Sequence, residues 1–490
     1  MRAIMGELLL RNRIYIWSAA VLSASLLVLF KAIYPYPNMV LDSYYYVLGA
    51  ISHADVSPWA IGYSWFLRFI GIFSHSPLLL VVVQYLLLEI SLMIFFLTLD
   101  LVFRLPRITK WLLIAFFFAN PLLLYCANFV MADCLFISLS LLWISLLLWI
   151  LYCPSRLGIW LHALLILAVF CVRYNALYYP LVAAVAILLS RISLRRKLLA
   201  IGLQVLVIGA FISYTTMRVG QISGKAQFSP FGNWKTANDA LYMYGHIYQD
   251  DHDSVPSKFV LLHDMVRRYF NRTGRVDDLL NFRSQFYGSA YMFTSGTPLV
   301  SYKVHLYGED TEFVNFKKMA AVGPLYGEYG AFLIRRFPGA FVQYFVGPNA
   351  IRYLFPPLEC FGSLPPYFLR PDYLGAAARQ WFGVNTLTVS WERINLRGNI
   401  FRPYQTIVFF IHIGFLLAIV GFLFIRGLRS LDIKERQVLM VLGTLWLFDL
   451  GFNLMVAATV LRYEIFLLMV EFSLMLVLFG KTFARPGVGH

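Results

Sequence analysis

The chain has 490 residues, of which 60% are hydrophobic and only 13% are charged, and its mean hydropathy is +0.69. Soluble domains carry about 25% charged residues, so the composition excludes an ordinary soluble protein. The net charge of +16 is compatible with nucleic-acid binding. However, the basic residues lie in short segments between apolar runs, which is typical of membrane topology signals. We therefore expect an integral membrane protein with no nucleic-acid partner.

Ten apolar segments approach the length of a membrane-spanning helix, about 20 residues. They are residues 14–34, 77–103, 111–127, 134–152, 158–172, 174–190, 198–217, 404–425, 437–458 and 463–480. The pair 158–172 and 174–190 is short, and the two segments could be divided differently. The sequence predicts a mainly α-helical, polytopic membrane protein with about ten transmembrane helices.

Basic residues mark every second connection between these segments. They occur at 104–110, 156, 191–197 and 426–436, and in the tail at Lys481 and Arg485. Short basic loops face the cytoplasm, so both termini are expected on the cytoplasmic side of an inner or plasma membrane. The chain then divides into three parts. They are a transmembrane module with a first outer loop at 35–76 (1–217), a small mixed extracytoplasmic domain (218–403), and the last spans with a short cytoplasmic tail (404–490).

The first outer loop contains the stretch "SPWAIGYSWFLRFIGIF". Ser57 followed by Pro58 is a helix-start pattern, with Ser as N-cap and Pro at the first helical position. The aromatic residues that follow would lie largely along one side of such a helix. This pattern predicts an interfacial helix with aromatic side chains at the depth of the lipid headgroups.

Two acidic residues stand where the chain re-enters or leaves the membrane on the outer side. Asp42 follows the first span, and Asp133 opens the fourth. A carboxylate there can serve as a general base for a lipid-borne substrate or orient an acceptor. The alternative for each is an N-cap, for a helix starting at Ser43 and for the fourth span, respectively.

Two outer arginines run against the positive-inside trend. Arg173 falls between two apolar segments, and Arg462 begins the last span beside Tyr463. The guanidinium fork suits a phosphate contact. The alternatives are a snorkelling interface arginine at Arg173 and an ion pair with Glu464 or another outer acid at Arg462.

Three further acids, Glu89, Asp449 and Glu471, lie inside the apolar segments. Such carboxylates line a proton or ion path, or they pair with Asn, His or backbone groups between helices. The region 218–403 also contains four histidines and the segment "QDDHD", but their spacing fits no metal-ligand pattern. No cofactor is indicated, although a divalent metal is compatible with the sequence.

Three segments resemble the GT-C superfamily of membrane glycosyltransferases that use polyprenyl-phosphate-linked sugars. The first is Asp42 followed by "PWAIGYSWFLRFIG". The second is "NPLLLYCANFVMADCLFISLSLL", with a proline, a tyrosine and then an acidic residue opening the next span. The third is the Arg-Tyr of "LRYEIFLLMVEF". Asp133 departs from the glutamate found at its place in many members. Within this superfamily, the chain most resembles the bacterial protein and lipid glycosyltransferases.

The resemblance implies transfer of a sugar from a polyprenyl-phosphate donor to an acceptor hydroxyl on the extracytoplasmic face, with inversion at the anomeric carbon. Asp42 would be the general base and Asp133 a second catalytic carboxylate. Arg173 and Arg462 would bind the donor phosphate, and Tyr63 and Tyr463 the substrate. The acceptor could be a lipid, a glycan or a protein, and membrane lipids would surround the chain.

Two alternatives stay open. One is a polymerase or ligase that transfers a whole glycan from a lipid pyrophosphate, which would need more outer cations than the sequence shows. The other is a non-enzymatic lipid or sugar transporter, which the acids inside the apolar segments would suit. Against a transporter, the sequence contains no internal repeat and no paired broken helices.

Overall fold

The computed structural model describes residues 2–35, 37–251, 253–274, 276–281, 288–310, 315–362, 373–383 and 391–483. Throughout these ranges the regular structure is helical, and the strand-like pairing is limited to an isolated bridge between Asn38 and Phe129. The mainly α-helical fold predicted from the sequence is confirmed.

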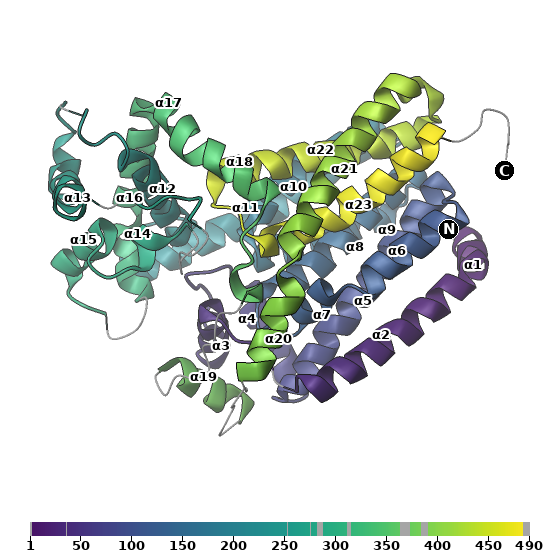
Figure 1. The fold of residues 1–490 in the computed structure, drawn as a ribbon, viewed down its shortest axis with the longest axis horizontal. Coiled ribbons are helices and arrows are strands. Elements are labelled where there is room, and N and C mark those ends of the chain that lie inside the picture. Colours follow the sequence, from purple (N-terminus) through teal and green to yellow (C-terminus); the bar gives the residue numbers. More distant parts are fainter. Residues whose placement is uncertain are drawn as a thin grey trace.

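The N-terminal part contains helices α1 to α11 (Figure 1). They are α1 (Arg2–Arg11), α2 (Arg13–Ile33), α3 (Leu41–Ile51), α4 (Gly62–Gly71), α5 (Pro77–Phe103), α6 (Arg107–Phe118), α7 (Pro121–Ala127), α8 (Ala132–Tyr152), α9 (Arg156–Val172), the 3₁₀ turn η1 (Tyr174–Tyr178), α10 (Tyr179–Leu189) and α11 (Leu194–Ser223).

The remaining elements form a middle region and a C-terminal group. The middle region contains α12 (Pro230–Tyr244), η2 (Ser257–Phe259), α13 (Val260–Thr273), α14 (Ala290–Phe293), α15 (Pro298–Tyr307), α16 (Phe316–Arg336), α17 (Pro338–Phe341), η3 (Val342–Val346), α18 (Gly347–Leu354), η4 (Glu359–Phe361) and α19 (Tyr373–Phe382). The C-terminal group contains α20 (Trp391–Phe401), α21 (Tyr404–Ile425), η6 (Leu428–Ser430), α22 (Ile433–Val456) and α23 (Leu461–Phe483).

Eight helical segments in the described part of the chain are long and apolar enough to cross a membrane. They are Arg13–Ile33, Pro77–Phe103, Arg107–Ala127, Ala132–Tyr152, Leu194–Ser223, Leu396–Ile425, Ile433–Val456 and Leu461–Phe483. Two shorter apolar segments, Arg156–Val172 and Tyr174–Leu189, coincide with the short pair in the sequence. At about 1.5 Å of rise per residue, each covers about 25 Å, less than the usual hydrocarbon thickness of about 30 Å. The structure therefore supports a polytopic membrane protein, and the count of ten spans stays a prediction.

The basic connections and the N-terminal helix gather at one end of the long helices. Arg11 and Lys110 both pair with Asp100, at 2.7 and 2.9 Å. At the same end, Lys481 pairs with Glu435. The Lys434 ammonium lies 3.8 Å from the centre of the Tyr152 ring. Figure 1 shows α1 and the C-terminal end of α23 there, opposite the middle helices α12 to α16.

The middle helices bury a core of their own around α12 and α16. We name the part from Pro230 to Val346 the middle domain. Helix α11 runs beyond the expected boundary at 217 and ends before Gly224, whose φ of 73° forms a left-handed C-cap. In the described residues the middle domain is helical and not the mixed structure that the sequence suggested.

The glycines of α16 bring this helix close to its neighbours. Gly323, Gly327 and Gly330 recur at helical spacing along one face. A Cβ atom at Gly330 would lie 2.5 Å from the Thr236 carbonyl oxygen of α12, and one at Gly323 would lie 2.3 Å from the Gln227 side chain. These glycines allow two helices to pack closely.

The first loop holds two helices, and neither begins where the sequence predicted. The second, α4, begins at Gly62 and not at Ser57. Trp59 stacks on Tyr45 with ring centres 4.4 Å apart, so this segment packs against α3 instead of entering a helix. Gly62 itself approaches the carbonyl of Cys171, where a Cβ would meet the oxygen at 2.5 Å. One face of α4 nevertheless stays exposed, with Trp65 and Phe69 on it.

Candidate active site

Three helix starts meet at the end of the bundle that faces the middle domain. Asp42 is the second residue of α3, Asp133 the second of α8, and Arg462 the second of α23. Negative side chains are favourable in the first turn of a helix and positive ones are not. The arginine in the first turn of α23 is therefore compensated by carboxylates from other elements.

Arg462 is the centre of this cluster. Its Nη1 atom donates to Asp42 Oδ2 at 2.8 Å and lies 3.6 Å from Asp133 Oδ2. Its opposite edge faces Glu359 of η4, with Nε 2.6 Å from Oε2 and Nη2 donating to Oε1 at 3.3 Å. The Nε contact is an ion pair without the alignment of a hydrogen bond. One guanidinium thus joins three carboxylates from three separate segments.

Arg173, the residue after α9, completes the cluster. It donates through Nη1 to Asp133 Oδ1. Its guanidinium lies between two aromatic rings, 4.7 Å from the centre of Tyr463 and 5.4 Å from that of Phe136. Tyr463 also lies 5.0 Å from the guanidinium of Arg462. The two arginines therefore share one aromatic neighbour and one carboxylate.

The capping alternative for the two aspartates does not describe this structure. The N-cap of α3 is Val40, and the N-cap of α8 is Met131. The side chain of Ser43 accepts a hydrogen bond from the Val40 amide, which closes the start of α3 without Asp42. Both aspartates pair with arginines instead.

The cluster has a buried side and a more open side. The side chain of Asp133 is 4% exposed, whereas those of Asp42 and Glu359 are 17% and 22% exposed. Arg462 lies between them at 12%. A ligand from the surface would therefore meet Asp42 and Glu359 first and Asp133 last.

Glu359 was not singled out from the sequence. It follows Pro356 and Pro357 in a segment without regular periodicity, and its partner Arg462 is 103 residues away. Its backbone has a φ of 48°, which is uncommon for a residue with a side chain. The available signal was that Glu359 is the single acidic residue of the stretch from 346 to 368.

The cluster carries an excess of negative groups. Three carboxylates face two guanidinium groups, which leaves one negative charge when all are ionised. Burial raises the pKa of Glu359, Arg462 opposes the increase, and the charges of Asp42 and Asp133 add to it. Burial, together with the charge of Asp42, also raises the pKa of Tyr46, which lies on α3 behind the cluster.

Tyr63, the other expected substrate contact, lies behind this cluster. It is fully buried, and its hydroxyl donates to Gln84 Oε1 at 2.6 Å. Its ring meets that of Tyr46 edge-on at 4.9 Å. Gln84 in turn donates to the Ala127 carbonyl at 2.8 Å. Tyr63 therefore ties α4 to α5 and to the segment that precedes Asp133.

The acids inside the apolar helices each have polar partners. Glu89 accepts from Ser23, Asp449 accepts from Tyr178 at 2.5 Å, and Glu471 lies 2.6 Å from His412 Nδ1. These contacts correspond to the pairing alternative. Their part in a proton or ion path stays untested.

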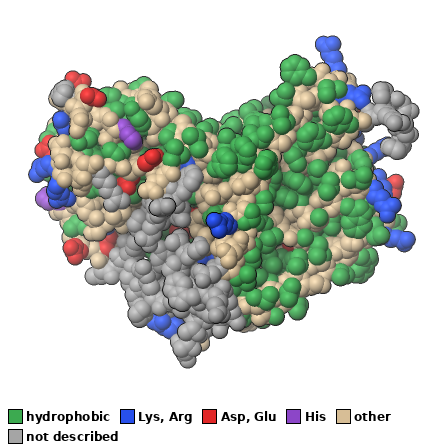
Figure 2. All heavy atoms as spheres, viewed as in Figure 1, with side chains coloured by type: hydrophobic (Ala, Val, Ile, Leu, Met, Phe, Trp, Pro, Cys, Tyr) green, Lys and Arg blue, Asp and Glu red, His purple; other side chains and the backbone are tan. Residues whose placement is uncertain are grey.

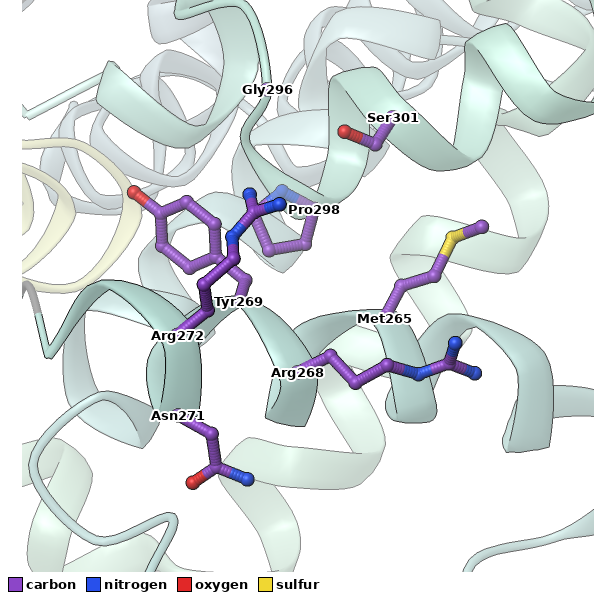
Figure 3. Close-up of a pocket in the computed structure, with 8 residues that line it drawn as sticks. All are labelled: Met265, Arg268, Tyr269, Asn271, Arg272, Gly296, Pro298 and Ser301. Carbon is purple, nitrogen blue, oxygen red and sulfur yellow. The ribbon is translucent and has the colours of Figure 1, made fainter.

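No cluster of three or more His, Cys, Asp or Glu residues placed to hold a metal ion occurs in the described residues. A surface cavity of about 520 Å³ lies elsewhere, on the middle domain between α13 and the start of α15 (Figure 3). Its lining includes Arg268, Arg272 and Tyr269, none of which belongs to the cluster around Arg462.

Comparison with protein-family models, with curated proteins and with solved structures finds no match for this chain.

Proposed function

We propose that the chain is an inverting membrane glycosyltransferase that moves a sugar from a polyprenyl-phosphate donor to an acceptor hydroxyl. One observation carries the proposal: Asp42 and Arg462, which are 420 residues apart in sequence, form an ion pair at 2.8 Å in a partly open cluster at the end of the apolar helices. A base for the acceptor and a cation for the phosphate are thereby adjacent. The three segments that resemble GT-C enzymes supply both residues.

The reaction follows from these two groups. The acceptor oxygen attacks the anomeric carbon as the bond from that carbon to the phosphate oxygen breaks. Asp42 takes the hydroxyl proton, and polyprenyl phosphate leaves with the bonding electrons. A leaving phosphate needs its charge stabilised, and Arg462 provides a guanidinium for it. Substitution from the opposite face inverts the anomeric centre.

The other residues have supporting roles in this proposal. Arg173 holds Asp133 in place, and Asp133 lies behind Arg462 and keeps its charge balanced. A direct contact of Arg173 with phosphate stays a prediction. Tyr463 packs against both guanidinium groups and offers an aromatic face to the sugar. Tyr63 acts from behind the cluster, through the packing of α4.

The membrane arrangement supports the same assignment. The basic connections gather at the end of the helices opposite the cluster. With the positive-inside rule, that end and both termini are cytoplasmic, and the cluster and the middle domain are extracytoplasmic. Helices α9 and α10, with η1, complete ten spans. The acceptor is a lipid, a glycan or a protein, and a lipid-pyrophosphate donor is the alternative substrate.

The proposal is tested with the purified protein in detergent and a polyprenyl-phosphate donor carrying a radiolabelled sugar. A membrane extract supplies acceptors. A glycosyltransferase moves the label into a new product and releases polyprenyl phosphate. A transporter leaves the donor chemically intact, and this outcome would contradict the proposal.

A further inference from the structure

We propose that the donor's phosphate binds on the edge of Arg462 that Glu359 occupies, and that the phosphate displaces Glu359 from this edge. This inference rests on the proposed function and deepens it. It assigns to Glu359 a positioning role. Glu359 holds the guanidinium of Arg462 in place, and it competes with the donor's phosphate for that guanidinium.

The geometry of Arg462 points to displacement. Asp42 and Asp133 both approach Nη1, whereas Glu359 is the carboxylate on the other edge, with contacts to Nε and Nη2. Nη2 also donates to the Tyr463 hydroxyl, at 3.4 Å. Arginine binds a carboxylate or a phosphate in this arrangement, with two oxygens of the ligand on one edge of the guanidinium. A phosphate can therefore replace Glu359 while Asp42 keeps its hydrogen bond to Nη1.

The contact of Glu359 is also the one best placed to open. Its Nε–Oε2 pair is 2.6 Å long but lacks hydrogen-bond alignment, so its attraction is mainly electrostatic. Glu359 has the most exposed side chain of the three carboxylates, at 22%.

The segment around Glu359 is anchored on both sides. The Leu461 amide donates to the Pro357 carbonyl at 3.0 Å, and Arg397 donates to the Gly362 carbonyl at 3.0 Å. The buried ring of Phe361 packs on Phe401 at 5.3 Å. Because the backbone is fixed at these points, the side chain rotates toward solvent and η4 stays in place.

The charge count agrees with this exchange. Three carboxylates share two arginines in the cluster. Adding a phosphate while Glu359 remained on Arg462 would bring a fourth anion to the same two cations. Moving Glu359 to solvent returns the number of anions at the two arginines to three, so the affinity for the donor depends on this competition.

The test measures binding of farnesyl phosphate to the full chain in nanodiscs by calorimetry, with farnesol and inorganic phosphate as comparison ligands. The variants are Glu359→Gln, Arg462→Gln and, as a matched control, Glu328→Gln. Glu328 is an exposed acid of the middle domain paired with Lys258. Glu359→Gln keeps the size of the side chain and removes its charge. We expect it to bind farnesyl phosphate about two- to fivefold more tightly than the wild type, the scale of a partly exposed ion pair.

In the same experiment Arg462→Gln should lose binding, and Glu328→Gln should match the wild type. If Glu359→Gln binds equally well or more weakly while Arg462→Gln loses binding, the displacement proposal is overturned and the proposed function stands. If Arg462→Gln binds like the wild type, the phosphate is not on Arg462 and both fail. If Glu359→Gln folds poorly, Glu359→Asp replaces it in the experiment. Its side chain is one methylene shorter, which moves the carboxylate away from Arg462, and the variant should bind farnesyl phosphate more tightly than the wild type.

Discussion

At the scale of single residues, two arginines hold a group of carboxylates that would otherwise repel one another. Arg462 contacts Asp42, Asp133 and Glu359, and Arg173 contacts Asp133 from the other side. Removing one partner of a buried ion pair is strongly destabilising, because it leaves a buried charge uncompensated. The cluster therefore links stability to function.

The pair of Arg173 and Asp133 gives a stability prediction. Arg173→Gln leaves Asp133, at 4% exposure, with only the 3.6 Å contact to Arg462. We expect the free energy of unfolding to fall by an amount at the lower end of about 3–5 kcal/mol, which is measured as a lower melting temperature in detergent. The double variant Arg173→Gln/Asp133→Asn should recover part of this loss. A double variant as unstable as the two single losses added together would refute the pairing.

The pKa of Glu359 gives a pH prediction. Burial raises this pKa, so Glu359 takes up a proton at a higher pH than an unperturbed glutamic acid. As the pH falls, Glu359 loses its charge and its hold on Arg462, and farnesyl phosphate binding by the wild type should strengthen relative to Glu359→Gln. The ratio of the two affinities is the quantity to measure, since the ionisation of the phosphate is common to both proteins. A constant ratio from about pH 8 to about pH 5, a range chosen to bracket a raised carboxyl pKa, would speak against the competition.

At the scale of elements, close helix contacts depend on a few glycines. Gly330 of α16 faces the backbone of α12, and Gly62 of α4 faces the backbone at the end of α9. Each lets two helices approach until a side chain would no longer fit. The first contact builds the middle domain, and the second sets the position of the loop that carries Asp42.

Gly330→Ala should destabilise the middle domain. The added Cβ would lie 2.5 Å from the Thr236 carbonyl oxygen, and overpacking of this kind costs about 1–3 kcal/mol. Hydrogen exchange of α12 and α16 measures the effect. Gly339→Ala, where nothing lies within 4 Å of the new atom, is the control and should leave exchange unchanged. Equal protection in the two variants would show that the α12–α16 contact tolerates a Cβ.

The long apolar helices could be predicted from the sequence because hydropathy is a property of each segment alone. The start of α4 could not, because it depends on the stacking of Trp59 on Tyr45, which is a tertiary contact. Asp42, Asp133, Arg173 and Arg462 lie together in the structure, and their roles in one site stay predictions. Glu359 was missed because its ion pair joins positions 103 residues apart and no local pattern marks it.

At the scale of the whole molecule, an apolar band separates two differently charged ends. Figure 2 shows hydrophobic side chains over the surface of the long helices, with basic side chains near the chain ends and both charge signs on the middle domain. This distribution is typical of a membrane protein seen from the lipid side. The candidate site lies where the apolar band meets the middle domain.

The proposed membrane sidedness can be measured. Two single-cysteine variants should be labelled differently. One replaces Lys225, in the segment leading to the middle domain, and the other replaces Arg429, in the basic connection between α21 and α22. Both positions are exposed. A membrane-impermeant maleimide should label Lys225→Cys in intact cells and Arg429→Cys only after permeabilisation. The reverse pattern would place the cluster on the cytoplasmic side. A Cys153→Ser background removes the one native cysteine that is not buried.

The most direct test of the central claim is the transfer activity of Asp42→Asn, compared with the wild type and with Asp55→Asn. Asn keeps the size of the side chain but cannot accept the acceptor's proton. Asp55 lies in the same loop, is 43% exposed and pairs with Arg218, so its variant controls for loss of a loop charge. We predict that Asp42→Asn loses transfer by about a hundredfold or more, the scale of a lost general base, with its melting temperature retained, while Asp55→Asn stays near the wild type. Unchanged transfer by Asp42→Asn would contradict the assignment of the base and with it the proposed active site.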